Sequence, residues 1–296
     1  MKEKIIEILN KENLYEIGFA KIEYYKDIEK FFLLQEKCNY KTPFQVGNVD
    51  SKTFKNERIF KTAIVVLMPY CKNSSKIEKK YAYASASFSG IDYHLLLKEK
   101  LKSVSLYLKS LGYCADIYVD NNFLDERYLA YRGGLGFYGL NHLLINDSYG
   151  SFFFIGIILT DAIFEYSKPL NKTCYMCKKC LEACPNGAIM EDGNFDGNKC
   201  ISFITQKKDI SIEEEKLINQ CIFGCDVCTN VCPHNLKVGE CNDEDVFKVD
   251  VNNYSHLSNN DFKKVYGKYS FSWRGRNIFE RNLNIYKQKL EKKDKL

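Results

Sequence analysis

Cysteines form the most distinctive chemical pattern in the sequence. The chain has 13 cysteines in 296 residues, and most of them lie between Cys174 and Cys241. Four have the spacing C-x2-C-x2-C-x3-C-P that is typical of bacterial ferredoxins: Cys174, Cys177, Cys180 and Cys184. At this spacing one loop can hold three corners of a [4Fe-4S] cube, while the fourth thiolate ligates a second cube. The pattern therefore predicts a site that moves single electrons.

A second and shorter string comprises Cys225, Cys228 and Cys232, followed by Pro233. The two strings supply seven of the eight thiolates that two cubes need, and the crossover of bacterial ferredoxins exchanges the last cysteine of each string. Candidates for the eighth ligand are Cys200, Cys221 and Cys241; since Cys221 is one residue out of register, we choose Cys200. The predicted ligands are Cys174, Cys177, Cys180 and Cys232 for one cube, and Cys184, Cys200, Cys225 and Cys228 for the other.

Two structural zinc sites are an alternative, because they would also use four thiolates each. Zinc sites normally pair two C-x2-C knuckles, so the longer string favours iron-sulfur clusters. The N-terminus lacks the features of a signal peptide, which predicts a cytoplasmic protein with reduced thiols and metal ligation rather than disulfides. The three cysteines outside the rich segment are expected to be buried and structural: Cys38, Cys71 and Cys114.

The elements that must position this chemistry follow from hydrophobic periodicity. Residues 2–13 and 92–111 have apolar residues at helical spacing, and the second helix is expected to end at Gly112. Residues 62–68, 115–119 and 151–159 are apolar or β-branched runs that suit strands. Helices that alternate with strands across residues 1–165 indicate an α/β or α+β domain with a central sheet.

Two further segments have unusual composition. Residues 130–151 are rich in glycine, which suits positive φ or a close approach to a ligand, although the segment has neither a dinucleotide fingerprint nor a Walker loop. Residues 261–296 carry eleven Lys or Arg against four acids, a net charge of +7, whereas the whole chain is +5. This basic tail also contains the aromatic residues Tyr266, Tyr269, Phe271 and Trp273. The combination suits phosphate contacts and base stacking; a solvated basic helix is the alternative.

Several motifs together resemble the epoxyqueuosine reductase family. They are GIDYH at residues 90–94, the segment VDNNFLDERYLAYRGGLGFYGLNHLLINDSYGSFFFIG at 119–156, the first cysteine string, CISFIT from Cys200 and IFGCDVCTNVCPHN from Ile222. The resemblance implies an α+β protein: a cobalamin-binding α/β domain with a central sheet (1–165), a bacterial-ferredoxin-like domain with two [4Fe-4S] clusters (166–245) and a short basic helical tail (246–296). It also implies reduction of epoxyqueuosine to queuosine at the wobble position of tRNA, with electrons passing from the clusters to cobalamin.

The resemblance assigns roles to individual residues. The proton donor of the family falls on Asp120; capping of the following helix is the alternative role for this side chain. His94 matches as well, either as a functional group or as an ordinary residue at a helix start. The cobalamin-facing segment falls on Gly134, Leu135, Gly136, Asn141, Gly150 and Ser151. In the tail, contacts with tRNA are expected from Arg274, Arg276 and Arg281.

The expected partners are the tRNA anticodon loop and a low-potential electron donor such as ferredoxin or flavodoxin. We expect a monomer with no membrane association. The sequence departs from the family pattern at Leu140, where Lys is usual, and at Asn122 and Phe123, which replace Ala-Pro. Two alternatives stay open: a related corrinoid reductase of a small molecule, and an electron carrier with no substrate of its own.

Overall fold

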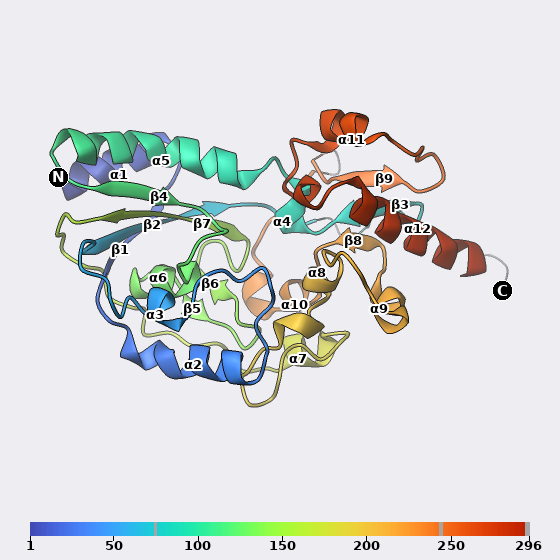
Figure 1. Cartoon of the computed structure of the whole chain (residues 1–296), viewed down its shortest axis with the longest axis horizontal. Helices are drawn as coiled ribbons and strands as arrows, with labels where there is room; N and C mark the ends of the chain where they lie inside the picture. The colour runs from blue at the N-terminus through green and yellow to red at the C-terminus, as the bar shows by residue number, and fades with distance from the viewer. Residues whose placement is uncertain (74–75, 243–244, 294–296) are drawn as a thin grey trace. The chain divides into compact units, whose positions relative to one another are not determined.

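Four antiparallel strands form the main sheet, in the order β1-β2-β7-β4. Their bounds are Glu16–Lys21 for β1, Thr62–Pro69 for β2, Phe153–Thr160 for β7 and Ala115–Tyr118 for β4. Helices α1 (Lys2–Lys11) and α5 (Tyr93–Ser110) cover one face of this sheet (Figure 1). The other face carries α2 (Lys26–Lys37), α3 (Val49–Lys52), α6 (Glu126–Arg132) and the small strands β5 (Phe137–Tyr138) and β6 (Leu144–Ile145). The predicted α+β class, helices and strands are confirmed.

Burial on both faces explains why the central strands are continuously apolar. On one face Val65, Leu67, Ile157 and Leu159 join the core cluster that includes Leu129 of α6. On the opposite face Gly156 leaves room for Leu97 and Leu101 of α5, because a Cβ at this position would lie 3.3 Å from Leu97 Cδ2 and 2.9 Å from Leu101 Cδ1. Each fully buried aliphatic side chain stabilises the fold by about 1.5–3 kcal/mol, so this sheet is a rigid support.

The computed structural model describes residues 1–73, 76–242 and 245–293, and the chain divides into two units. The first contains Met1–Pro69 and His94–Cys177; the second contains Tyr70–Tyr93 and the residues from Lys178 onward. The predicted boundaries at 165/166 and 245/246 therefore do not coincide with these units. Residues 294–296 of the predicted tail lie outside the described residues.

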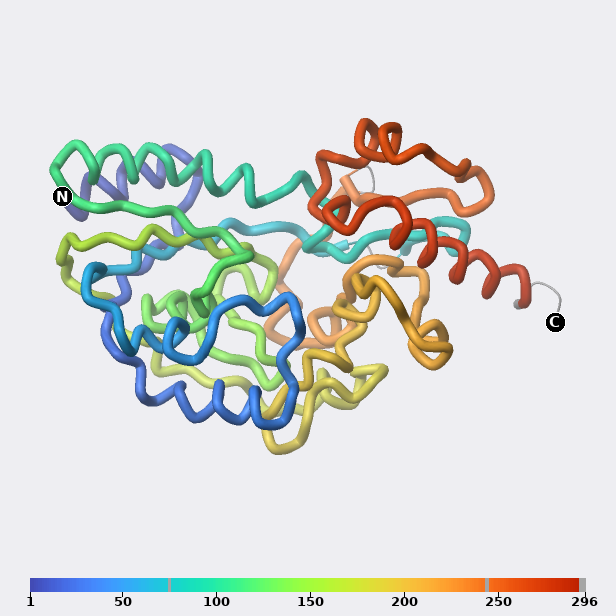
Figure 2. The backbone as a smooth tube through the Cα atoms, in the orientation of Figure 1, coloured from blue at the N-terminus to red at the C-terminus, as the bar shows by residue number. Residues whose placement is uncertain are grey.

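The second unit has a smaller sheet, in the order β8-β3-β9. Strand β3 (Tyr81–Ala84) pairs parallel with β8 (Cys221–Phe223) and antiparallel with β9 (Lys248–Asp250). Figure 2 shows these stretches, far apart in sequence, running side by side. The remaining elements are short: α4 (Ala86–Ser89), α7 (Lys179–Ala183), η1 (Gly197–Lys199), α8 (Ile201–Ile204), α9 (Ile212–Leu217), α10 (Val227–Asn230) and η2 (Pro233–Asn235).

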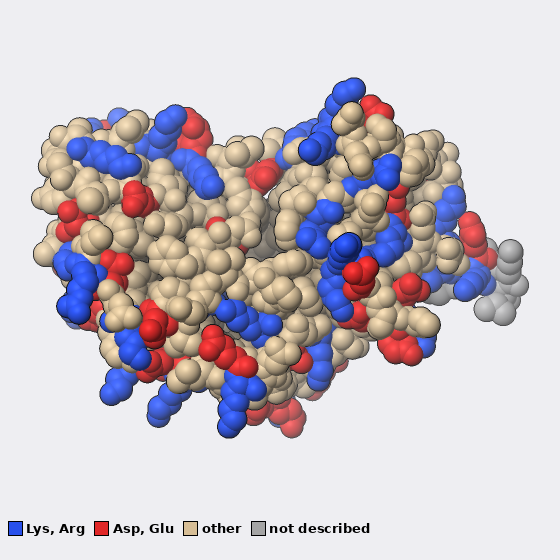
Figure 3. Space-filling model, viewed as in Figure 1, with Lys and Arg blue, Asp and Glu red and all other residues tan. Residues whose placement is uncertain are grey.

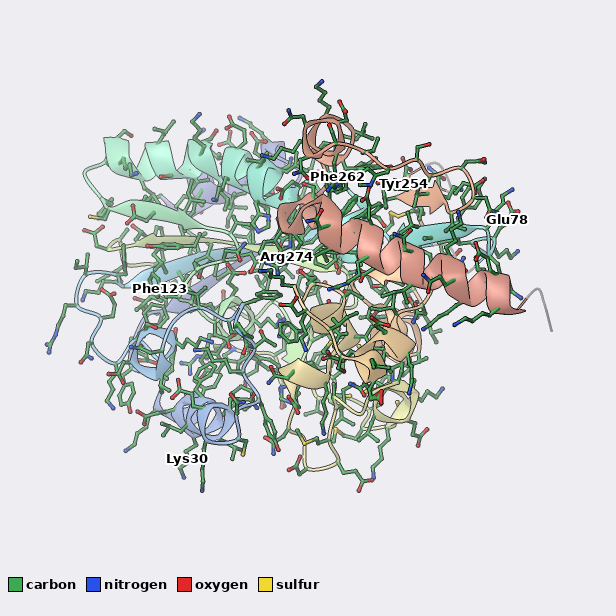
Figure 4. All side chains as sticks on the ribbon, turned by 45° about the vertical axis from the view of Figure 1, so that its right-hand side comes forward. Lys30, Glu78, Phe123, Tyr254, Phe262 and Arg274 are labelled. Atoms are coloured by element: carbon green, nitrogen blue, oxygen red, sulfur yellow. A yellow bond between two sulfur atoms is a disulfide. The ribbon has the colours of Figure 1, made fainter. Side chains whose placement is uncertain are left out.

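Aromatic residues of the C-terminal segment form the core of the second unit. This segment contains α11 (Asn259–Tyr266), η3 (Ser270–Arg274) and α12 (Arg276–Lys293). The Phe247 ring lies 4.4 Å from Phe271, and the Phe262 ring lies 5.5 Å from Phe279 (centroid distances). Figure 4 shows Phe262 and Tyr254 beside α12. The predicted tail is thus a structural part of this unit.

The cysteines outside the two strings differ from expectation. Cys71 and Cys241 form a disulfide within the second unit, which corrects the prediction of reduced thiols throughout and removes Cys241 from the candidate cluster ligands. Cys38 and Cys114 are exposed rather than buried. Cys38 is the C-cap residue of α2 and Cys114 lies in the turn before β4, so both sit where the chain faces solvent.

Candidate functional site

Asp120 lies on a loop that leaves the edge strand β4. Asp120 and Asn121 both have left-handed backbone, with φ of 45° and 46°. This conformation costs about 1–3 kcal/mol for each residue without a compensating contact, although Asp and Asn tolerate it better than other side chains. The N-cap of α6 is Asp125, whose carboxylate accepts from Tyr128 N at 2.8 Å. Capping is therefore not the role of Asp120.

The loop brings Asp120 to His94, the second residue of α5. His94 Nε2 lies 3.4 Å from Asp120 Oδ2 and 3.2 Å from Asn121 Nδ2. The Asp120 side chain is 52 % exposed and that of His94 is 23 % exposed, so the pair faces solvent and can receive a substrate. Two motifs that are separate in the sequence thus meet at one point, where a carboxyl and an imidazole can exchange a proton.

Glu126, which was not among the predicted site residues, holds this loop through hydrogen bonds. Its Oε1 accepts hydrogen bonds of 2.7 Å from Asp120 N and from Asn122 Nδ2. Burial and the neighbouring charge of Asp120 raise the pKa of Glu126 to about 7. A Glu in the first turn of a helix ordinarily indicates only a favourable interaction with the helix dipole, so nothing in the sequence pattern pointed to the loop.

The glycine-rich segment is packed against its own unit. Gly134 has a φ of +74°, and a Cβ there would lie 2.6 Å from the Lys168 carbonyl oxygen; at Gly136 it would lie 2.6 Å from that of Ile145. These glycines are thus required by the protein's own backbone. Leu135, Asn141 and Ser151 are buried. Leu140, which stands where the family has Lys, is buried too, so an apolar side chain suits that position.

Asn141 tests whether this segment fits the cobalamin implied by the resemblance. Its side chain is 4 % exposed, and its Oδ1 accepts from Leu143 N at 3.3 Å. Within the described part of the chain, its buried Nδ2 has no hydrogen-bond partner. An unsatisfied buried donor costs about 1–3 kcal/mol, and a corrin amide arm could accept from it. The segment therefore fits the group at this residue.

The second unit carries six of the eight predicted cluster ligands. Cys180 lies in α7, and Cys184 is the C-cap residue of that helix. Cys200 is the N-cap residue of α8, and Cys228 lies in α10. Burial, together with the nearby thiols of Cys200 and Cys184, raises the pKa of Cys225 to about 12. Three of the four thiols predicted for one cube are thus neighbours. A cavity of about 290 Å³ adjoins Cys225 and is also lined by Tyr83, Cys221 and Asp226.

Cys221 is less suited than Cys200 to be the eighth ligand. Its thiol is buried in β8 and donates to the carbonyl oxygens of Phe223 and Gly224, both at 3.6 Å. Burial raises the pKa of this thiol well above its usual value. Because burial also raises the pKa of the predicted ligand Cys225, the two hydrogen bonds and not the pKa set Cys221 apart. Cys200 is partly exposed at the start of α8.

Cys174 and Cys177 lie in the final loop of the first unit. In the described residues, no three His, Cys, Asp or Glu side chains already stand close enough to hold a metal ion. A single ion needs its ligands close together, whereas a [4Fe-4S] cube takes its four thiolates at separate corners. Thiolates are nevertheless the donor set that iron-sulfur clusters take, so the residues fit the predicted group.

The three predicted tRNA contacts make hydrogen bonds inside the second unit. Arg274 Nε donates to Gln206 O at 2.7 Å, and Arg276 donates to Leu257 O at 2.7 Å. Arg281 donates to the carbonyl oxygens of Lys207 and Lys208. Burial lowers the pKa of Arg281. These arginines fasten the C-terminal segment to the rest of the unit, a role that net charge alone did not reveal.

The aromatic residues of the tail divide into two groups. Phe271 is buried in the core, whereas Trp273 is 53 % exposed. The Arg274 guanidinium carbon lies 4.8 Å from the centre of the Trp273 ring. Figure 3 shows Lys and Arg side chains gathered over α11 and α12 on the visible face of this unit. The exposed ring in a basic setting suits a nucleobase. No helix among the described residues is long and apolar enough to cross a membrane.

Comparison with known proteins agrees with these features. Residues 173–235 match the family model of a 4Fe-4S double cluster binding domain. An epoxyqueuosine reductase of Bacillus cereus is 32% identical over 304 residues, covering 95% of this chain and 78% of the relative.

Two solved structures are similar in fold as well. One is an epoxyqueuosine reductase with an epoxyqueuosine-modified tRNA-Tyr stem loop (TM-score 0.88, 28% identity). The other is the Bacillus subtilis enzyme with its catalytic aspartate loop swung out of the active site (TM-score 0.88, 27% identity). Each covers 96% of this chain, and this chain covers 80% of each. The iron-sulfur motifs, the α+β fold and near full-length similarity lead to one conclusion: the chain belongs to the epoxyqueuosine reductase family and is an oxidoreductase.

Proposed function

We propose that this protein reduces epoxyqueuosine to queuosine at the wobble position of tRNA anticodons, with electrons that pass from two [4Fe-4S] clusters to cobalamin. The observation that carries the proposal is the meeting of Asp120 with His94, at 3.4 Å, on a rigid sheet edge. Both residues belong to motifs that resemble the family. The net reaction takes two electrons and two protons, and it releases the epoxide oxygen as water.

Asp120 is the proposed proton donor. As the carbon–oxygen bond of the epoxide breaks, its carboxyl gives a proton to the oxygen, and His94 restores that proton. Cobalamin, when bound, would supply the strongly reducing centre that reduction of the substrate carbon needs. We assign cobalamin contacts to Gly134, Leu135, Gly136, Asn141, Gly150 and Ser151. The cluster ligands are those predicted from the spacing, with Cys200 as the eighth.

The tRNA contact is assigned to the C-terminal segment. Trp273, with Arg274 stacked on it, is the group best suited to hold a splayed base of an anticodon loop. Arg276 and Arg281 add positive potential near the phosphates, while their hydrogen-bond donors also serve backbone carbonyls. A low-potential ferredoxin or flavodoxin is the proposed electron donor, and the cytoplasm is the proposed location.

One assay tests the proposal directly. Protein with anaerobically reconstituted clusters is incubated with cobalamin, a strong reductant and an epoxyqueuosine-containing anticodon stem loop, and the RNA is then analysed by mass. We expect the loss of one oxygen. No turnover by protein that holds both cofactors would refute the proposal; retention of clusters without cobalamin would favour an electron carrier, and absence of RNA binding would favour a small-molecule reductase.

The ligand choice has its own test. Cys200→Ala should lose one cluster's share of iron, whereas Cys221→Ala should keep it. Iron per chain and the cluster absorption spectrum measure the difference. The reverse result would assign the eighth position to Cys221.

A further inference from the structure

We propose that Glu126 is a positioning residue that holds the Asp120 loop in its working conformation. This inference rests on the proposed function, in which Asp120 donates the proton. A single side-chain oxygen, Glu126 Oε1, accepts from Asp120 N and from Asn122 Nδ2, both at 2.7 Å. One acceptor thus connects the backbone of the proposed proton donor to a side chain two residues farther along the loop.

The loop needs such a support because of its own conformation. Asp120 and Asn121 have consecutive left-handed φ angles, which a non-glycine chain adopts only where its surroundings fix it. Asn122 continues the network: its Nδ2 also donates to Asp120 O at 3.0 Å, and its Oδ1 accepts from Leu124 N at 2.8 Å. Asn122 is one of the residues at which the sequence departs from the family's Ala-Pro.

Glu126 can act as a support because it begins an anchored helix. In α6, Tyr128, Leu129 and Ala130 are buried against the main sheet. The neighbouring Asp125 caps the same helix, and its side chain accepts from Tyr128 N rather than from the loop. The acceptor is therefore fixed to the sheet, and the loop is fixed to the acceptor. The Bacillus subtilis relative, whose catalytic aspartate loop can swing out, indicates what such a support would prevent.

The role assigned to Glu126 requires an acceptor oxygen and not a negative charge. Both bonds end on Oε1, and an amide oxygen at the same place accepts them as well. The proposal therefore separates two substitutions: Glu126→Ala removes the acceptor, and Glu126→Gln keeps it. Asp125→Ala distinguishes the loop support from a general loss of helix stability, because it removes the N-cap of α6 but leaves Glu126 Oε1 in place.

The experiment measures kcat and KM for the epoxyqueuosine-containing stem loop with cluster-loaded and cobalamin-loaded protein. A displaced catalytic group can lower the rate by about 100-fold, so Glu126→Ala should lower kcat by about that factor while KM for RNA is unchanged. Glu126→Gln should restore most of kcat. Asp125→Ala should lower the melting temperature and keep kcat near that of wild type.

Three results would overturn the inference. They are wild-type kcat in Glu126→Ala, a loss in Glu126→Gln equal to that in Glu126→Ala, and a loss in Asp125→Ala as large as in Glu126→Ala. If Glu126→Ala fails to fold, as shown by its cluster content and melting curve, Asn122→Ala tests the same network: it should lower kcat, and an unchanged kcat would count against the loop support. Failure of the wild-type protein to turn over at all would instead refute the proposed function.

Discussion

The two units hold their functional residues in different ways. In the first, Asp120 and His94 are positioned by a four-stranded sheet whose central strands are mainly apolar and buried along most of their length. In the second, the cysteines lie on helices of four or five residues, such as α7, α8 and α10, and in the turns between them. Helices this short have little stability of their own. The comparison teaches that the Asp120 loop, the proposed proton-donating site, is ordered by packing. The predicted cluster ligands of the second unit depend instead on the metal and on the aromatic core of that unit.

Loss of a cluster ligand gives the largest expected effect. Cys225→Ala should abolish turnover, remove iron and lower the thermal stability of the second unit, because metal binding contributes folding free energy where local structure is weak. Iron content, turnover and limited proteolysis measure this. Cys38→Ala, at an exposed cysteine of the first unit, is the matched control and should behave as wild type. Equal iron content in Cys225→Ala and Cys38→Ala would contradict the difference proposed between the two units.

Asp120→Asn should give the next largest effect. Loss of a general acid lowers the rate by about 100- to 10,000-fold, while the sheet that supports the loop stays intact. The variant should therefore keep its clusters, its cobalamin and its melting temperature. Asp116→Asn, at an exposed carboxylate of strand β4, which precedes the loop, is the control. A kcat for Asp120→Asn equal to that of Asp116→Asn would contradict the assignment.

Asn282→Ala probes how the C-terminal helix holds the second unit. Asn282 is fully buried, and its Nδ2 donates to the carbonyl oxygens of Thr205 and Ile222 at 2.7 and 2.8 Å. Truncation removes both of these buried hydrogen bonds, so the free energy of unfolding should fall by about 1–3 kcal/mol. Asn277→Ala, at an exposed position of the same helix, should change it little. Denaturant unfolding curves give the free energy of unfolding of both variants, and equal values would contradict the prediction.

The pH dependence of stability should show an effect of about the same size as Asn282→Ala. Burial and the charge of Asp120 raise the pKa of Glu126 from 4.5 to about 7, while Asp125 lies beside it and His94 contacts Asp120. The folded protein therefore keeps a proton that the unfolded chain releases between these values, so this stabilisation is present below pH 4.5 and is lost as the pH rises through 7. Each pH unit between the two pKa values is worth about 1.4 kcal/mol, so relative to Glu126→Gln the wild type should lose about 2–3 kcal/mol between pH 5 and 8. If the free energies of unfolding of wild type and Glu126→Gln differ by the same amount at pH 5 and at pH 8, that result would argue against the raised pKa.

Periodicity predicted the elements whose burial is local and regular. The helix expected at 92–111 is α5, and the strand expected at 62–68 is β2, because long apolar patterns leave one suitable structure. Strand β3 was not predicted: its four residues pair with β8 and β9, which lie more than 130 residues away. A strand this short is stabilised by partner strands that are distant in the sequence, so its own residues do not predict it.

The site could be predicted only where its functional residues lie close together in the sequence. The cysteine spacing indicated the cluster domain, which the family model confirms. The contact between His94 and Asp120 depends instead on how α5 and β4 pack, and the disulfide joins Cys71 to a partner 170 residues away. The guanidinium bonds of the tail arginines were also hidden, because charge counts do not say which carbonyls a side chain meets. The assignment of the eighth ligand stays a prediction.

The path of the chain through its second unit limits how the protein can be divided. Strand β3 lies between β8 and β9 in the small sheet, yet it comes from residues 81–84, ahead of most of the first unit. A fragment that begins at residue 178 would carry both outer strands without the one that joins them. A single cut at residue 178 therefore does not free a complete cluster domain. A transplant between relatives must bring residues 70–93, which carry β3, and also the predicted ligands Cys174 and Cys177.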